Sequence, residues 1–452
     1  MSETLMISVS GMRGHVGTDL TPELVARHAA ALGAWVRSRG GSGVVIGRDA
    51  RTSGPMFTRA AIAGFQSVGV DVIDVGVAPT PTVQMAVEYH RAGAGLILTA
   101  SHNPIEWNAL KFVGPDGIFL DAESGAMVRQ LADQGPPRVG WDQVGQVTTD
   151  DSAIERHLDA ILALPELDLA AIRARGFHVA IDCVRGAGAP TMLALFERLG
   201  VRVSGIHLMA DGHFPHPPEP VPENLGDLAA LVRESGADIG MAVDPDVDRL
   251  ALVDEHGEPL GEDYTLALAA RAVLDRQPEG VPRAVVANLS TSLVVEDAAR
   301  AAGARFVRAP VGEANVARAI VAEGAVVGGE GNGGVILPAL HVGRDAPLAA
   351  ALILQRLVAS GQGVSALVRG APQYTIVKAK AARGGDLAAQ YAALRSSFPD
   401  ALADDRDGLR LSWPDRWVHV RPSGTEPIVR IIAEAPTGAE ANDLVARARA
   451  AG

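Results

Sequence analysis

The sequence has little cysteine and no long apolar segment. Its single cysteine, Cys183, excludes an intramolecular disulfide and any metal site built from several cysteines, and it fits a reducing compartment. No apolar run approaches the roughly 20 residues that span a bilayer, and residues 1–7 lack the basic and apolar regions of a signal peptide. We therefore expect a cytoplasmic protein that is neither secreted nor inserted into a membrane.

Positive charge is also scarce. The chain has 40 Lys and Arg residues against 53 Asp and Glu residues, which gives a net charge of −13. Because nucleic-acid backbones select basic surfaces, this charge argues against non-specific binding of nucleic acid. A phosphate ester would meet the same repulsion, so a site for one must contain a local cluster of arginine and lysine.

The composition is otherwise that of a folded chain, with 48% hydrophobic and 21% charged residues. Its 452 residues exceed the size at which one core keeps growing, so we expect three or four domains. Three apolar runs, each followed by a helical stretch, a small-residue turn and a second apolar run, begin at Gly43, His178 and Ala284. This order predicts three βαβ units with mostly parallel strands.

The tail from about Ala371 follows another pattern, because short strand-like stretches alternate there with two helical ones. We therefore predict an α/β protein in which three related mixed α/β domains precede a C-terminal α+β domain. The expected domains are 1–147, 148–253, 254–369 and 370–452, and the clearest linker is Gly370-Ala-Pro-Gln.

A serine stands in a turn that follows an apolar stretch. The stretch 94–98 leads into Ser101, His102 and Asn103, and the turn ends at Pro104. A serine on such a rigid edge suits a nucleophile, although serine needs a base or a metal to activate it. A capped turn, in which Ser101 and Asn103 bind backbone groups, explains the same residues.

Three carboxylates, Asp244, Asp246 and Asp248, alternate along a turn between two apolar runs. Like charges crowded at a turn repel one another, and a hard cation with oxygen ligands relieves the repulsion. Mg²⁺ fits this description and often takes a phosphate oxygen as a further ligand. A solvated acidic turn is the alternative, whereas an EF-hand is excluded because its central glycine and terminal glutamate are missing.

Two later loops have the composition of ligand-binding segments. A guanidinium, two hydroxyls and a turn glycine form a plausible phosphate cradle, without the spacing of a Walker loop, at Arg421, Ser423, Gly424 and Thr425. In the other loop, glycines flank Glu330 and Asn332, whose oxygens accept hydrogen bonds from hydroxyls such as those of a sugar. A flexible glycine hairpin is the alternative for the second loop.

Together these segments resemble the α-D-phosphohexomutase family over essentially the whole chain. The motifs that carry the resemblance are Ser10-Gly-Met-Arg-Gly14, Gly47-Arg-Asp-Ala-Arg51, Thr99-Ala-Ser-His-Asn-Pro104, Asp211-Gly-His-Phe-Pro215, Asp244-Pro-Asp-Val-Asp-Arg249, the loop with Glu330, and Arg421-Pro-Ser-Gly-Thr-Glu426. The serine, metal and phosphate loops are specific in combination. The resemblance implies four domains around a central cleft.

The resemblance also implies roles for single residues. Ser101 would carry a phosphoryl group and share a Mg²⁺ ion with Asp244, Asp246 and Asp248. Arg13 and Lys111 would serve proton transfer and charge stabilisation near the serine, and His102 would orient the serine loop, although a turn hydrogen bond explains His102 as well. The sugar would be held by Arg249, Glu330 and Asn332, and the non-reacting phosphate by Arg421, Ser423, Gly424, Thr425 and Arg430.

The implied reaction interconverts a hexose 6-phosphate and a hexose 1-phosphate. Phosphorylated Ser101 would give its phosphoryl group to the substrate, the resulting hexose 1,6-bisphosphate would turn in the cleft, and the serine would take back the other group. Mg²⁺ is the expected cofactor and the bisphosphate the expected activator. The expected partner is a small-molecule sugar phosphate, and the expected assembly is a monomer or a homodimer.

The sugar loop departs from the common pattern of the family, Gly-Glu-x-Ser-Gly-His, because this chain has Gly329-Glu-Gly-Asn-Gly-Gly334. This form resembles a branch of phosphoglucosamine mutase-like proteins, so we expect glucosamine 6-phosphate as substrate, with phosphomannomutase/phosphoglucomutase activity as the alternative. Glu313 stands near the position of a substrate-contacting basic residue in some relatives, and it could pair with an ammonium group or form a salt bridge within its domain. His341 and Arg344 are expected to order the next helix.

Two other classes of protein stay open. A metal-dependent phosphatase using Ser101 would share the nucleophile and the metal, but it would not need a second phosphate cradle. A non-catalytic sugar-phosphate binder would keep the glycine loop and the cradle, but it would not need a serine beside three carboxylates.

Overall fold

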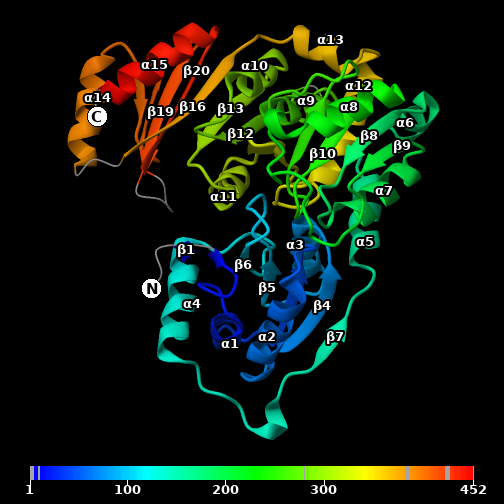
Figure 1. Cartoon of the computed structure of the whole chain (residues 1–452), viewed down its shortest axis with the longest axis vertical. Helices are drawn as coiled ribbons and strands as arrows, with labels where there is room; N and C mark the ends of the chain where they lie inside the picture. Colours follow the sequence, from blue (N-terminus) through cyan, green and yellow to red (C-terminus); the bar gives the residue numbers. More distant parts are fainter. Residues whose placement is uncertain are drawn as a thin grey trace.

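The computed structural model describes residues 5–8, 11–278, 280–281, 283–382, 386–422 and 428–450, which form four sheets with helices packed on them. We refer to the parts built on these sheets as the first to fourth domains. In Figure 1 the first domain, in blue and cyan, forms one lobe, and the other three lie together above it. Three sheets are mixed and the last is antiparallel, which confirms the predicted fold class. Within the described ranges, no helix is long and apolar enough to cross a membrane.

The first domain has a seven-stranded sheet covered on both faces. Its elements are β1 (Met6–Ser8), β2 (Gly11–His15), α1 (Pro22–Ser38), β3 (Gly43–Arg48), α2 (Gly54–Gln66), β4 (Asp71–Val77), α3 (Thr80–Tyr89), β5 (Ala94–Leu98), β6 (Trp107–Val113), α4 (Ala122–Gln134), a 3-10 turn (Trp141–Gln143) and β7 (Val147–Thr149). The strand order is β1-β2-β6-β5-β3-β4-β7. Because side chains alternate along β3, Val44 and Ile46 pack with α1 and α2, whereas Val45 packs with α3.

The second and third domains repeat a smaller pattern of four strands each, β11-β10-β8-β9 and β13-β12-β14-β15. The second contains α5 (Ala153–Leu162), α6 (Leu169–Arg175), β8 (His178–Asp182), α7 (Gly188–Arg198), β9 (Arg202–Ile206), a 3-10 turn (Pro222–Asn224), α8 (Gly226–Ser235), β10 (Ile239–Val243) and β11 (Leu250–Val253). The third contains α9 (Asp263–Leu274), β12 (Ala284–Asn288), α10 (Leu293–Ala301), β13 (Arg305–Ala309), α11 (Glu313–Glu323), β14 (Val327–Glu330), β15 (Gly334–Ile336), α12 (Ala346–Ser360) and α13 (Val364–Arg369). The parallel pairs β3–β4, β8–β9 and β12–β13 confirm the three predicted βαβ units.

Each of these three sheets also contains an antiparallel hairpin, and each hairpin ends in a loop singled out from the sequence. Strands β5 and β6 carry the serine loop between residues 98 and 107. Strands β10 and β11 carry the loop with the three aspartates, and β14 and β15 carry the glycine loop. The internal repeat of the fold therefore presents one functional loop per domain.

The fourth domain is a five-stranded antiparallel sheet with two helices. Its elements are β16 (Thr375–Ala382), α14 (Leu387–Ser397), β17 (Leu402–Asp404), β18 (Leu409–Ser412), β19 (Trp417–Pro422), β20 (Ile428–Ala435) and α15 (Gly438–Ala450), and the strand order is β16-β20-β19-β18-β17. The expected phosphate loop joins β19 to β20, and its residues Ser423, Gly424 and Thr425 lie outside the described residues.

The second and third domains have separate sheets but share one hydrophobic core. One continuous hydrophobic cluster includes Met241 and Leu250 of the second domain together with Leu266 and Leu352 of the third. Helix α12 lies within this cluster, and its first nine residues, Ala346–Leu354, are all apolar and buried. The first and fourth domains each have a core of their own.

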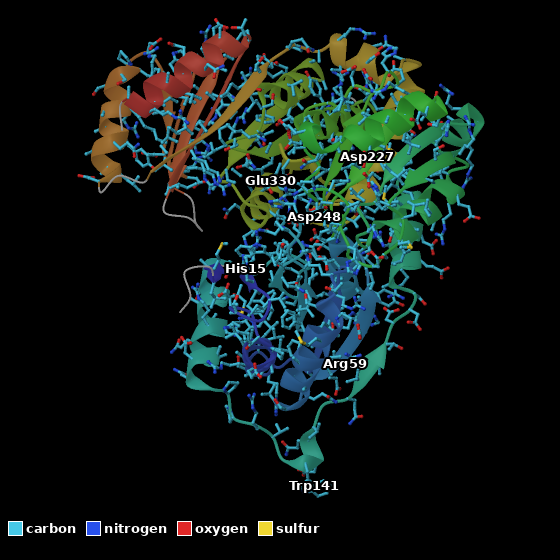
Figure 2. The ribbon with its side chains drawn as sticks, in the orientation of Figure 1. His15, Arg59, Trp141, Asp227, Asp248 and Glu330 are labelled. Atoms are coloured by element: carbon cyan, nitrogen blue, oxygen red, sulfur yellow. The ribbon has the colours of Figure 1, made fainter. Side chains whose placement is uncertain are left out.

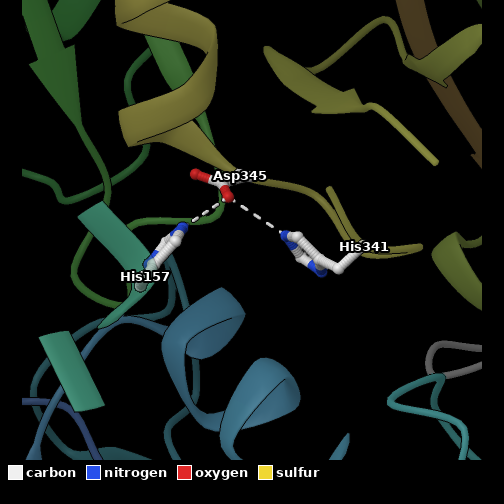
Figure 3. A group of neighbouring side chains, drawn as sticks. All are labelled: His157, His341 and Asp345. Atoms are coloured by element: carbon white, nitrogen blue, oxygen red, sulfur yellow. Dashed lines mark hydrogen bonds and ion pairs between the residues drawn. The ribbon is translucent and has the colours of Figure 1, made fainter. Parts of the chain in front are cut away.

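A buried polar cluster joins the first three domains (Figure 3). Asp345 caps the N-terminus of α12 through the backbone N–H of Leu348. Its Oδ2 lies 2.7 Å from Nε2 of His157 in α5 and 3.0 Å from Nε2 of His341. The other ring nitrogen of His157 lies 2.8 Å from the hydroxyl of Thr82 in α3. One carboxylate therefore ties together helices from three domains.

The fourth domain is attached to the third through polar contacts. The carboxylate of Glu434 in β20 accepts hydrogen bonds from the hydroxyl of Ser292 and the backbone N–H of Leu293, at the N-terminus of α10. Nδ1 of His419 in β19 lies 2.8 Å from the hydroxyl of Ser290. Both Glu434 and His419 are fully buried, so these contacts are shielded from water.

Replacing His419 with Gln should remove a pH dependence of stability. Burial lowers the pKa of His419 from 6.5 to about 4. Between these values the unfolded chain binds a proton that the folded chain excludes, so the folded state loses up to about 1.4 kcal/mol per pH unit as the pH falls. The difference in unfolding free energy between wild type and His419→Gln should therefore shrink from pH 7 to pH 4.5 in urea titrations.

The control for this experiment is His256→Gln, because the His256 side chain is 63% exposed. That variant should follow the pH dependence of wild type. A constant difference between wild type and His419→Gln across this pH range would contradict the assignment.

Candidate active site

Ser101 lies three positions after the end of β5 and is buried. Its φ of +49° lies in the left-handed region, which is costly for a residue with a side chain. The buried guanidinium of Arg51 holds this turn, since it donates to the carbonyls of Ser101, Asn103 and Pro104, each at 2.6 Å. Asp49 fixes Arg51 in turn, with Nε of Arg51 3.0 Å from its carboxylate. Arg51 belongs to one of the motifs of the family resemblance. Its contacts join distant segments of the chain, so the sequence did not predict that it would hold the serine turn.

The three aspartates lie in the turn between β10 and β11, and all three are fully buried. The hydroxyl of Ser101 donates to Oδ2 of Asp244 at 2.8 Å, so the serine loop and the acidic turn meet although they belong to different sheets. Oδ1 of Asp246 and Oδ1 of Asp248 have no hydrogen-bond partner among the described residues. This arrangement of oxygen atoms is compatible with a metal ion.

The three aspartates differ in how well their negative charges are compensated. Burial, with the neighbouring carboxylates of Asp246 and Asp248, raises the pKa of Asp244 well above its usual range. Burial acts in the same direction on Asp246, but the charge and hydrogen bond of Lys111, together with the Thr80 hydroxyl, lower its pKa. One carboxyl group of the turn therefore tends to hold a proton as long as no cation is bound.

Lys111 and Arg13 approach this turn from the first domain. Nζ of Lys111 in β6 lies 2.7 Å from Asp246 and 3.6 Å from Asp248. Burial disfavours its charged form, but the charges of these two aspartates raise the pKa of Lys111, so it stays cationic at neutral pH. Arg13 in β2 donates to the side chain of Asn103 in the serine loop at 2.6 Å.

His102 is half-buried beside the serine. Its Nδ1 lies 3.4 Å from the Ser101 hydroxyl, and its Nε2 lies 3.8 Å from Glu219 of the second domain. Burial, with the positive charges of Arg249 and Arg13, lowers the pKa of His102 well below its usual value, so the imidazole is neutral at neutral pH.

Arg344 connects the acidic turn to the third domain. Its guanidinium contacts Asp248 at 2.5 Å, Glu330 at 2.8 Å and Glu313 at 3.1 Å. Burial opposes this charge, but the three carboxylates raise the pKa of Arg344 well above its usual value. The sequence predicts only that Arg344 orders the next helix, whereas in the structure Arg344 is the shared counter-ion of three loops. Glu313 forms the salt bridge within its domain that the sequence left open.

The glycine loop lies beside the metal turn. Figure 2 shows Glu330 and Asp248 close together above the first domain. The carbonyl oxygen of Gly333 accepts a hydrogen bond from the backbone N–H of Leu250 at 3.0 Å. A Cβ atom at Gly333 would lie 2.4 Å from the carbonyl oxygen of Leu250, and its φ is +87°, so only glycine fits there.

These loops border one cleft of about 590 Å³, a size typical of a small-molecule site. Apart from the three aspartates, every expected site residue that the structure describes lines this cleft. These residues are Arg13, Ser101, His102, Lys111, Arg249, Glu330, Asn332, Arg421 and Arg430. The five expected cationic residues therefore face one cleft of an acidic protein, and Arg344 adds a sixth.

Arg421 is held at the edge of the cleft by a residue that the sequence did not suggest. Its Nε lies 3.1 Å from Oδ2 of Asp407. The same oxygen accepts a hydrogen bond from the backbone N–H of Val311 in the third domain at 3.0 Å. Asp407 precedes Gly408, and from the sequence an Asp-Gly pair predicts a turn but no contact with an arginine.

Domain models of one family match most of the chain. The descriptions are "Phosphoglucomutase/phosphomannomutase, alpha/beta/alpha" domains I, II and III, at residues 5–137, 155–257 and 261–374, and the C-terminal domain at residues 376–451. Fold and site define the class as that of the phosphohexomutases, isomerases that transfer phosphate within a molecule. The chain belongs to the phosphoglucomutase/phosphomannomutase family.

Full-length relatives agree with this assignment. A "Probable phosphoglucosamine mutase" of Methanopyrus kandleri is 38% identical over 441 residues, which cover 96% of this chain and 95% of the relative. A "Phosphoglucomutase/phosphomannomutase" of Thermococcus kodakarensis is 38% identical over 442 residues with the same coverage. The crystal structure of a family protein from Burkholderia thailandensis superposes with a TM-score of 0.88 at 28% identity, covering 100% of this chain and 97% of that one.

Replacing Arg344 with Gln should destabilise the protein strongly. The change leaves Asp248, Glu313 and Glu330 buried without their shared cation, and removing one partner of a buried ion pair costs about 3–5 kcal/mol. Denaturant unfolding in the absence of metal measures the loss. Arg300→Gln removes a 62% exposed guanidinium from Glu296, which keeps its ion pair with Arg308, and should cost less than about 1 kcal/mol. Equal losses in the two variants would refute the role given to Arg344.

Proposed function

We propose that this chain is a phosphoglucosamine mutase, which interconverts glucosamine 6-phosphate and glucosamine 1-phosphate. The observation that carries the proposal is the hydrogen bond of 2.8 Å between the Ser101 hydroxyl and Asp244, at the base of a cleft lined by arginine and lysine. A serine that passes a phosphoryl group to and from a sugar phosphate needs both the acidic turn and those cations.

The names of the relatives support an amino sugar phosphate as substrate and also allow other hexose phosphates. One relative at 38% identity is named a probable phosphoglucosamine mutase, and another at the same identity is named a phosphoglucomutase/phosphomannomutase. Phosphomannomutase/phosphoglucomutase activity is therefore the second candidate. A sugar phosphatase using Ser101 is a more distant one.

We infer that Asp244, Asp246 and Asp248 hold Mg²⁺. Three hard carboxylate ligands, and the two buried oxygens that lack a hydrogen-bond partner among the described residues, fit such an ion. When bound, Mg²⁺ neutralises charge on a phosphoryl group in transfer.

The other residues have distinct parts in this proposal. Cationic Lys111 and Arg13 stabilise negative charge near Ser101, and Lys111 can donate a proton to an oxygen that leaves the phosphorus. His102, which is neutral, can accept a proton from an attacking sugar hydroxyl.

The substrate is held by two groups of residues. Arg249, Glu330 and Asn332 contact the sugar, and the distal phosphate is bound by Arg421, Arg430 and the loop residues Ser423, Gly424 and Thr425. A hexose 1,6-bisphosphate serves as intermediate and activator. A monomer or a homodimer stays the expected assembly, and a cytoplasmic location stays a prediction.

Mg²⁺ should raise the thermal unfolding midpoint of the protein. A ligand that binds only the folded state adds about 2.7 kcal/mol of stability at 100 times its dissociation constant. In Asp246→Asn, which loses one metal ligand, the gain should be much smaller. Asp275→Asn is the matched control, since Asp275 pairs with Arg271 and Arg356 on the surface, and it should respond as wild type does. Equal responses of wild type and Asp246→Asn would contradict the metal assignment.

A substrate panel tests the reaction itself. Glucosamine 6-phosphate, mannose 1-phosphate and glucose 1-phosphate are each supplied with Mg²⁺ and the matching bisphosphate, and intact-mass analysis follows phosphate on the serine. We expect the fastest turnover on glucosamine 6-phosphate and a phosphorylated Ser101. Ser101→Ala should lose at least about 10³-fold in rate, because the covalent carrier is gone.

The outcomes separate the candidates. Faster turnover of mannose or glucose phosphate would favour the second candidate, and release of inorganic phosphate faster than isomer formation would favour a phosphatase. No turnover on any of the three sugars, with Ser101 never phosphorylated, would refute a mutase.

A further inference from the structure

A second group of metal-ligating side chains lies in the second domain, at residues Asp182, His207 and His216. Asp182 ends β8 and His207 directly follows β9, and these parallel neighbours bring the two side chains to the same edge of the sheet. Nδ1 of His207 lies 3.0 Å, and Nε2 of His216 2.9 Å, from the two carboxylate oxygens of Asp182. The three possible ligand atoms lie within 4.8 Å of one another.

The remote nitrogens of both imidazoles face acceptors. Nδ1 of His216 lies 2.9 Å from the carbonyl oxygen of Pro217, and because a carbonyl only accepts, this nitrogen must carry a proton. Nε2 of His207 faces the carboxylate of Asp227 at 3.9 Å. Metal-binding histidines have this arrangement, in which the second nitrogen is directed to a carbonyl or a carboxylate.

Nε2 of His216 is directed at the carboxylate of Asp182 and lies 2.9 Å from it, and this hydrogen bond raises the pKa of His216. A divalent ion between His216 and Asp182 would take the place of this hydrogen bond.

Access to solvent distinguishes this cluster from the one in Figure 3. His207 and His216 are 21% and 17% exposed, whereas Asp182 beneath them is 2% exposed. By contrast, His157, His341 and Asp345 are at most 2% exposed, and Thr82 already pairs with His157. The cluster at Asp182 therefore has an open side for an incoming ion.

We propose that Asp182, His207 and His216 bind a divalent transition ion, represented by Zn²⁺, through two imidazole nitrogens and one carboxylate. This ligand set suits Zn²⁺, whereas Mg²⁺ prefers oxygen ligands alone, so the site differs in chemistry from the turn of three aspartates. The proposal does not depend on the mutase activity.

The loop that supplies His216 also contacts the serine loop, which gives the ion a structural consequence. Phe214 packs under the guanidinium of Arg51 at 4.9 Å, and Arg51 holds the carbonyl of Ser101. Farther along, Glu219 lies 3.8 Å from His102 and 3.9 Å from Arg249. An ion that fixes His216 therefore fixes a segment that borders the candidate active site.

The test uses the full-length protein with excess Mg²⁺, so that the aspartate turn is occupied before Zn²⁺ is titrated by calorimetry. We expect one Zn²⁺ per chain. His207→Gln and His216→Gln should each weaken this binding by at least about 10- to 100-fold, since outer partners of such ligands alone contribute that much. His213→Gln is the matched control, because His213 is exposed in the same loop and the substitution keeps its backbone N–H, which donates to Asp211.

X-ray absorption at the zinc edge of wild type is a second readout that needs no variant. Scattering from two imidazoles and one carboxylate is expected. Three results would each overturn the proposal: no Zn²⁺ binding in excess Mg²⁺, no imidazole scattering, or wild-type affinity in both His→Gln variants. Loss of binding in Asp246→Asn alone would also overturn it, because the Zn²⁺ would then occupy the aspartate turn.

Discussion

The crowding of negative charge at the centre of the molecule is the constraint on which the rest of the structure depends. Five buried carboxylates meet there, from Asp244, Asp246, Asp248, Glu313 and Glu330. They form ion pairs with Lys111 from the first domain, with Arg344 from the third, and with Arg249 of the second, to which the acidic turn itself belongs. Because unpaired buried charges are very costly, the cleft forms only when all three domains are in place.

The repeating part of the fold and the loops of the site were predictable from the sequence. The βαβ units follow from apolar runs of strand length separated by helical stretches, and these patterns are local. The serine loop and the acidic turn were also recognisable, because a serine after an apolar stretch indicates a nucleophile and three closely spaced carboxylates indicate a metal site. That Ser101 would touch Asp244 came from the family resemblance and not from the spacing, since 143 residues separate them.

The residues that the sequence did not reveal act over long distances. Arg51 binds carbonyl groups about 50 positions away, and Arg344 joins Asp248, 96 positions earlier, to its own domain. Asp407 orients Arg421 while it bonds a backbone group of the third domain. Arg344 and Asp407 are charged residues in ordinary loop segments, and nothing in their neighbours along the chain distinguishes them from solvated side chains. Arg51 stands in a motif of the family resemblance, but that motif does not indicate which groups its guanidinium binds.

The shared core of the second and third domains limits how the molecule can move. Separating these two domains would expose a continuous apolar cluster, so they behave as a single rigid body. The fourth domain has a core of its own and is attached by polar contacts such as those of Glu434 and His419. The first domain is attached more firmly, because the apolar cluster around Val83 in α3 also includes Ala153 of the second domain and contacts Ala314 of the third. Hinge rotation of the fourth domain would therefore exchange hydrogen bonds with water rather than uncover a core, and it would change the width of the cleft at the edge where Arg421 lies.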